Sequence, residues 1–145
     1  MRIMAIDYGD ARTGVAVSDA LGMLAGFTTV IHSRSQDEVV AQLKVLAREH
    51  GVEELALGWP KNMDASLGER AQLCQALAER LRAETGLPVT LWDERRTTVD
   101  AHRILSENGR RGKRRKNTVD AVAATLILEG FLSYRRLHPR AEEGE

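Results

Sequence analysis

The sequence predicts a single α/β domain whose five-stranded mixed sheet is covered by helices on both faces. The chain has 145 residues with 43% hydrophobic and 29% charged side chains, which suits one globular domain. Strand-like segments follow one another through the first 31 residues, and helical and strand-like segments then alternate. The predicted order is β-β-β-α-β-α-β-α-α over residues 1–135, followed by a polar, frayed tail at 136–145.

The first three segments read as an antiparallel meander. Residues 2–8 form an apolar run, residues 12–19 alternate with a period of two, and residues 22–31 are rich in β-branched and apolar side chains. Short turns containing Asp and Gly separate the segments, and turns of this length join antiparallel neighbours.

Helices and strands alternate in the middle of the chain. Two capping boxes, in which Ser and Glu stand three residues apart, each precede apolar residues at helical spacing and a terminating glycine. The predicted elements are a helix from Ser35 to Gly51, a strand at 52–58, a helix from Ser66 to Gly86 and a strand at 88–92.

Two further helices close the chain. The first begins at Thr97 or Thr98 and ends near residue 108. The second is capped by Asn117 and runs to about Tyr134, with apolar residues on its inner face. Residues 110–116 join the two as a basic loop.

The charge distribution points to a polyanionic partner. The chain contains 21 basic and 21 acidic residues, so the net charge is zero. Residues 94–116, however, hold nine basic side chains against three acidic ones, a local charge of +6. A run of basic residues usually forms a solvated surface, but this one precedes a candidate acidic site by a few residues and favours contact with phosphates. Its members are Arg110, Arg111, Lys113, Arg114, Arg115 and Lys116.

The composition excludes several other classes. One cysteine, Cys74, rules out a disulfide framework and a thiolate metal site, and the four histidines lack metal-binding spacing. No apolar run approaches the roughly 18 residues of a membrane span, and no signal pattern opens the chain. We therefore expect a cytoplasmic protein without membrane contact.

Three carboxylates are predicted at the ends of elements. Asp7 ends the first strand, Glu94 ends the fifth, and Asp120 falls in the first turn of the last helix among apolar neighbours. Carboxylates without nearby His or Cys ligands suit a hard cation such as Mg²⁺ or Mn²⁺, which supports phosphoryl transfer. Taken singly, each has a structural alternative: a turn for Asp7, a surface ion pair for Glu94 and a helix-dipole interaction for Asp120.

Two neighbouring acids compete with this set. Asp93 precedes Glu94, but alternation along an extended strand sends the two side chains to opposite faces. Glu94 is the better ligand if Trp92 packs on the same face as the partner carboxylates. Asp19 ends the second strand and is either a supporting group or a turn residue.

Several motifs, taken in order, resemble the YqgF family. They are Asp7-Tyr-Gly with Arg12-Thr-Gly-Val-Ala-Val-Ser-Asp19, Gly58-Trp-Pro-Lys-Asn-Met-Asp64, Asp93-Glu-Arg-Arg-Thr-Thr98 and Val119-Asp-Ala-Val-Ala-Ala124. The similarity extends from about Ile3 to Tyr134. The family comprises ribonuclease-H-like proteins described as Holliday junction resolvases and as nucleases that mature the 5′ end of pre-16S ribosomal RNA.

The resemblance implies a ribonuclease-H-like fold and a metal-dependent nuclease. Asp7, Glu94 and Asp120 would be the catalytic and metal-binding set, with Mg²⁺ or Mn²⁺ as cofactor. Arg12 and Arg95 match family motif positions and would position a nucleic-acid substrate. Processing of pre-16S ribosomal RNA is the expected function, and cleavage of four-way DNA junctions, which would require a homodimer with two active sites, is the alternative.

The chain departs from the family pattern at three places. Ala65 stands where the family loop commonly has Gly, and Arg96 stands where an apolar residue is usual. Ala123 and Ala124 occupy places where related resolvases often carry a further acid or His. The last departure argues against a second tightly bound metal ion.

Two other functional classes remain open from the sequence. A strand–Asp-x-Gly–strand opening also occurs in actin-like ATPases and sugar kinases, but those enzymes need two such domains. A non-catalytic RNA-binding module is the second alternative. Aromatic residues make up only 4% of the chain, which argues against binding by base stacking alone.

Overall fold

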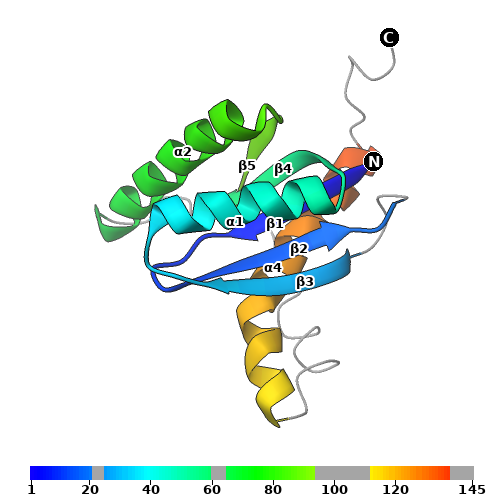
Figure 1. Ribbon diagram of the computed structural model, residues 1–145, viewed down its shortest axis with the longest axis horizontal. Coiled ribbons are helices and arrows are strands. Elements are labelled where there is room, and N and C mark those ends of the chain that lie inside the picture. The colour runs from blue at the N-terminus through cyan, green and yellow to red at the C-terminus, as the bar shows by residue number, and fades with distance from the viewer. Residues whose placement is uncertain (21–24, 60–64, 94–111, 138–145) are drawn as a thin grey trace.

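The computed structural model describes residues 1–20, 25–59, 65–93 and 112–137, and it has the predicted α/β architecture (Figure 1). In the figure, the helices α1 and α2 lie on one side of the sheet and α4 crosses the other side. The elements are β1 (Arg2–Asp7), β2 (Arg12–Ser18), β3 (Ala25–His32), α1 (Gln36–Glu49), β4 (Val52–Trp59), α2 (Ala65–Thr85), β5 (Val89–Asp93) and α4 (Gly112–Leu137).

The five strands form one mixed sheet in the order β3-β2-β1-β4-β5. β2 pairs antiparallel with both β1 and β3, whereas β4 pairs parallel with both β1 and β5. It follows that β1, β3, β4 and β5 all run in one direction and that β2 runs in the other. We call the edge at which those four strands end, and at which β2 begins, the carboxyl edge. The expected meander and the expected mixed sheet are both confirmed.

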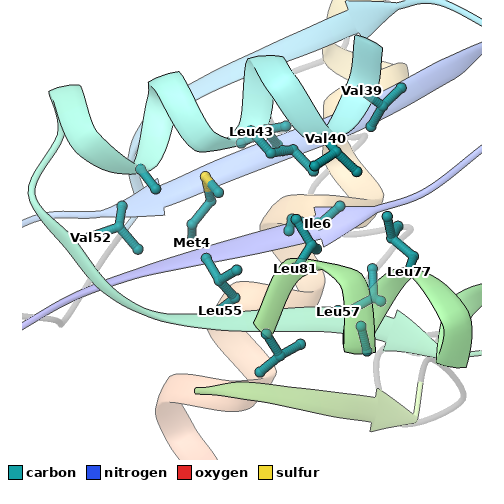
Figure 2. Packing of buried hydrophobic residues seen from close by; sticks show 14 of the residues in the cluster. Met4, Ile6, Val39, Val40, Leu43, Val52, Leu55, Leu57, Leu77 and Leu81 are labelled. Atoms are coloured by element: carbon teal, nitrogen blue, oxygen red, sulfur yellow. The ribbon is translucent and has the colours of Figure 1, made fainter. Parts of the chain in front are cut away.

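A hydrophobic cluster fills the space between the sheet and the helices α1 and α2 (Figure 2). Met4 and Ile6 of β1 contribute to it, together with Leu43 of α1 and Leu77 and Leu81 of α2. All five side chains are fully buried. Because β1 is covered on both faces, its sequence is a continuous apolar run instead of an alternating one.

A second cluster lies on the opposite side of the sheet, which we call the α4 face. Ile3 and Ala5 of β1 belong to it, together with Trp92 of β5 and with Ile127 and Phe131 of α4. The rings of Trp92 and Phe131 meet edge to face at a centroid distance of 5.8 Å. The prediction of helices on both faces is therefore confirmed.

Local signals fix the ends of α1 and α2. The Ser35 side chain accepts a hydrogen bond of 3.2 Å from the backbone N–H of Glu38, as its capping box predicts. Gly51 and Gly86 follow the two helices with φ of 64° and 73°. A side chain is disfavoured in this left-handed region, which explains why both helices stop before a glycine.

The last helix differs from its prediction. We expected a basic loop at 110–116 and a helix capped by Asn117, but α4 already begins at Gly112. Lys and Arg have high helix propensity, so this segment can extend a helix whose later turns are held by packing. The prediction that Asp120 lies in the first turn is wrong for the same reason, since it is the ninth residue of α4.

Most other boundaries agree with prediction to within one or two residues. α2 begins at Ala65, one residue before the predicted cap at Ser66, and β3 ends at His32 instead of residue 31. α4 ends at Leu137, three residues beyond the predicted end near Tyr134, so the first two residues of the predicted frayed tail at 136–145 are helical instead. The predicted start of β3 at residue 22, the predicted helix at 97–108 and the rest of the tail lie outside the described residues. Within the described chain, none of the helices combines the length and the apolar character needed to span a membrane.

A buried ion pair joins α4 to the sheet. The Arg135 guanidinium donates two hydrogen bonds to the Glu54 carboxylate, at 2.9 Å to Oε1 and 2.7 Å to Oε2. The Glu54 side chain is 2% exposed, and the guanidinium also lies over the Phe131 ring at 4.7 Å. This two-point contact between a strand and a helix fixes where the carboxyl-terminal half of α4 sits on the sheet.

Candidate functional site

Asp7 lies at the carboxyl edge, as the last residue of the central strand β1. Its side chain is partly exposed, whereas the four residues before it are buried. Since Ile3 and Ala5 pack on the α4 face and side chains alternate along a strand, Asp7 also points to the α4 face. The structure therefore places this carboxylate at the site that open α/β sheets most often use for ligands.

Asp120 occupies a position on the same side of the molecule. The structure describes its backbone, which lies in α4 four residues before Ala124 and seven before Ile127. Both of those residues are buried against the α4 face. Residues four and seven apart share one side of a helix, so the Asp120 position lies on the stripe of α4 that faces the sheet.

Glu94 lies outside the described residues, and β5 ends one residue before it. Trp92, two residues earlier, is 7% exposed and packs on the α4 face. The sequence favours Glu94 over Asp93 as a ligand on the condition that Trp92 packs on this face, and the structure meets that condition. Assignment of Glu94 to the site stays a prediction.

The predicted acidic set is therefore described only in part. Within the described side chains, no three from His, Cys, Asp and Glu come together as a metal-binding group. Of the three predicted ligands, only Asp7 has a described side chain. Carboxylates are suitable donors for Mg²⁺ or Mn²⁺, and the partial exposure of Asp7 at a strand end gives such an ion access.

The predicted nucleic-acid residues fall into three groups. Arg12 begins β2 at the carboxyl edge, and its side chain is exposed. Lys113, Arg114, Arg115 and Lys116 belong to the first turns of α4, where the structure describes their backbone. Arg95, Arg110 and Arg111 lie outside the described residues.

Two basic residues at the same edge are absent from the predicted set. His32 ends β3, and Arg34 follows it before α1 begins; both side chains are exposed. Sequence inspection treated His32 only as a histidine without metal-binding spacing. The predicted meander already implied that β3 ends at this edge, and the missing information was the register that sets His32 opposite Arg12.

Comparison with known proteins agrees with the fold and the motifs. A family model described as "RuvX: Holliday junction resolvase" matches residues 1–134. A "Putative pre-16S rRNA nuclease" of Halothermothrix orenii is 46% identical over 139 residues, covering 95% of this chain and 99% of that protein. A protein of Moorella thermoacetica with the same description is 49% identical over 132 residues, covering 91% and 94%.

A solved structure shares the architecture at low sequence identity. "T. thermophilus RuvC in complex with Holliday junction substrate" superposes with a TM-score of 0.63 over 95% of this chain and 96% of that one, at 16% identity. At this identity the likeness shows the fold alone, and it confirms the ribonuclease-H-like architecture. With the family model matched over residues 1–134, the resemblance to the YqgF family is confirmed, and the chain belongs to the RuvX family of nucleases, described as Holliday junction resolvases.

Proposed function

We propose that the protein hydrolyses phosphodiester bonds of nucleic acid with the help of a divalent metal ion, Mg²⁺ or Mn²⁺. The observation that carries this proposal is the position of Asp7, a partly exposed carboxylate at the carboxyl end of the central strand. It points to the same face against which the Asp120 stripe of α4 packs. Asp7, Glu94 and Asp120 would hold the ion.

The residues of the chain have separate parts in this reaction. When bound, a divalent cation lowers the pKa of a water molecule and stabilises negative charge on the leaving oxygen. Asp7, at the end of a strand buried on both faces, gives the centre a rigid ligand. Arg12, exposed at the start of the neighbouring strand, can hold a phosphate beside the carboxylates that would otherwise repel it.

The substrate proposed first is the 5′ end of pre-16S ribosomal RNA, processed in the cytoplasm. Support comes from the descriptions of relatives that are 46% and 49% identical over nearly the whole chain. A four-way DNA junction is the second candidate, supported by the description of the family. Symmetric cutting of a junction needs two active sites, so this second function further requires a homodimer.

A side-by-side cleavage assay tests the proposal. Pre-ribosomal RNA, single-stranded oligonucleotides and four-way DNA junctions are incubated with the protein in Mg²⁺, in Mn²⁺ and in EDTA. We expect cleavage only with metal, and loss of cleavage in Asp7→Asn. Arg48→Gln is a matched control because Arg48 is an exposed residue near the other end of α1.

The outcomes separate the alternatives. RNA cleavage by a monomer supports ribosomal processing, and paired incisions by a dimer support junction resolution. Binding of RNA without cleavage in any metal would favour the RNA-binding module. ATP binding would favour the actin-like and sugar-kinase alternative, and either of these two results would overturn the nuclease proposal.

A further inference from the structure

Basic side chains extend along the carboxyl edge from Asp7 toward β3. Asp7 pairs with Gly14 across the β1–β2 ladder, and Arg12 pairs with His32 across the β2–β3 ladder. Arg12 stands two residues before Gly14 on β2, so its side chain points to the same face as Asp7. Directly opposed residues of an antiparallel pair share a face, which places His32 there too.

The turn after His32 is fixed to the loop that follows Asp7. The backbone N–H of Ser33 donates a hydrogen bond of 3.0 Å to the carbonyl of Ala11. The Ser33 hydroxyl then accepts one of 3.0 Å from the N–H of Ser35, the cap of α1. Arg34 lies between these two serines, so the backbone that carries it is held at the carboxyl edge from both sides.

The acidic residues nearest to Arg34 in sequence are bound to other groups. Asp37 forms an ion pair of 2.7 Å with Arg80 of α2. Glu38 accepts a hydrogen bond of 2.6 Å from the Ser33 hydroxyl and one of 3.4 Å from Gln42. Across the described part of the chain, Arg34 forms no ion pair within 4.0 Å. Its charge is therefore available to an anion from outside.

We propose that Arg12, His32 and Arg34 form a phosphate-binding track that carries one strand of the substrate across the β2–β3 end of the carboxyl edge. This inference rests on the proposed nuclease function and extends it, because it says on which side of Asp7 the strand passes. The track reads the sugar–phosphate backbone and not the bases, since it consists of cationic and imidazole groups with no aromatic platform.

The position of the track gives it a role that α4 does not duplicate. The basic residues of α4 come from the last helix, whereas this track is built from β2, β3 and the turn before α1. A single strand of nucleic acid bound at Arg34 and Arg12 passes the end of β3 and the start of β2 before it reaches Asp7 at the end of β1. Two of the track's side chains, Arg12 and His32, come from strands of the sheet, and Arg34 follows Ser33, whose N–H is bonded to the loop before β2.

The test measures binding without cleavage. Fluorescence anisotropy of labelled single-stranded RNA and DNA of one sequence is recorded in EDTA at pH 8, over a series of salt concentrations. The variants are Arg34→Gln, His32→Ala and their combination, with Arg48→Gln as the control. Arg34 and Arg48 are both exposed arginines, but Arg34 precedes α1 at the carboxyl edge whereas Arg48 lies in the last turn of that helix, away from this edge.

We expect Arg34→Gln to reduce the slope of log affinity against log salt by about 0.7, the value for one phosphate contact on a single strand. His32→Ala removes one imidazole hydrogen bond to the backbone of the substrate and should weaken binding about 2–10-fold. Arg48→Gln should change neither quantity. Melting curves of all variants should coincide with that of the parent.

Two results would contradict the proposed track, and they distinguish failure of the track alone from failure of the proposed function. If the parent binds nucleic acid and Arg34→Gln has the same slope as Arg48→Gln, the strand takes another path while the nuclease proposal stands. If the parent binds neither RNA nor DNA at low salt, the proposed function fails together with the track.

Discussion

If Asp7 holds a metal ion together with the two further predicted acids, its place at the end of a buried strand would oppose stability to metal binding. Three carboxylates brought together without metal would repel one another, which would raise the pKa of at least one of them. Functional sites commonly reduce stability in this way.

The first prediction follows from this opposition. Asp7→Asn should abolish metal-supported cleavage and leave the metal-free protein at least as stable as the parent. Mg²⁺ or Mn²⁺ should raise the melting temperature of the parent more than that of the variant, because a ligand that binds only the folded state stabilises it. Melting curves with and without metal, together with one cleavage assay, measure both effects.

A purely structural role of Asp7 predicts the opposite changes in stability and cleavage. If Asp7 only stabilises a turn, its replacement should cost about 0.5–2 kcal/mol, as the loss of a capping group does. An Asp7→Asn protein that melts at a lower temperature and still cuts would contradict the assignment of Asp7 to the metal site.

Among single residues, those marked by local chemistry could be predicted from the sequence. Asp7 could be located because an apolar run ends there, and the Ser35 cap because its partner is three residues away. His32 and Arg34 could not be located beside Arg12, since their place there depends on the register of the β2–β3 ladder. Such register depends on contacts between distant segments.

On the scale of elements, α4 links the predicted metal centre to the basic run. Its first turns carry Lys113 and Arg114, Asp120 follows two turns later, and its later part is packed on the sheet. The sequence predicted this helix with its start at Asn117, because Asn is a good capping residue. The basic residues before Asn117 have high helix propensity, and the helix begins at Gly112 instead. A continuous helix ties the basic side chains to the backbone that holds Asp120.

The second prediction concerns these basic residues. Replacement of Arg114, Arg115 and Lys116 by Gln should weaken binding of nucleic acid by similar factors across different base sequences. The slope of log affinity against log salt should fall by about 0.7–0.9 for each phosphate contact that is lost. Salt titrations with two unrelated oligonucleotides measure this, and an unchanged slope would make the segment an ordinary solvated surface.

The third prediction concerns the ion pair that joins α4 to the sheet. Arg135→Met leaves the Glu54 carboxylate buried without its bidentate partner and should cost about 3–5 kcal/mol of unfolding free energy. Glu54→Leu combined with Arg135→Met removes both charges and should recover most of that loss. Lys44→Gln is the control, because the Lys44–Glu84 pair is more than 30% exposed on both sides and should contribute no more than about 1 kcal/mol.

Urea denaturation of the four proteins decides this prediction. Equal destabilisation by Arg135→Met and by the double replacement would mean that the pair acts through its packing, including the contact of Arg135 with the Phe131 ring. Recovery in the double variant would show that the charge left behind causes the loss.

Over the whole molecule, the fold follows from patterns that repeat along the chain. Three successive strand-like segments predicted the antiparallel part of the sheet, and the alternation of strands with capped helices predicted the parallel half. The meeting of Asp7, Glu94 and Asp120 could only be hypothesised, because the packing of α4 against the sheet decides where Asp120 stands. The motifs identified the family, and the sheet order brings the ends of β1 and β5, which have only β4 between them, to one edge of the sheet.

The outer strand β3 has a consequence for how the protein behaves at high concentration. Its eight residues include no Lys, Arg, Asp, Glu or Pro, and within the described chain β2 is its one strand neighbour. Natural sheets commonly protect such a border with charge, because exposed backbone groups can recruit a strand from another molecule. Thr28→Lys, at an exposed position in the middle of β3, should therefore raise the concentration at which light scattering first detects aggregates and leave the melting temperature unchanged. An onset that does not move would mean that aggregation starts elsewhere on the molecule.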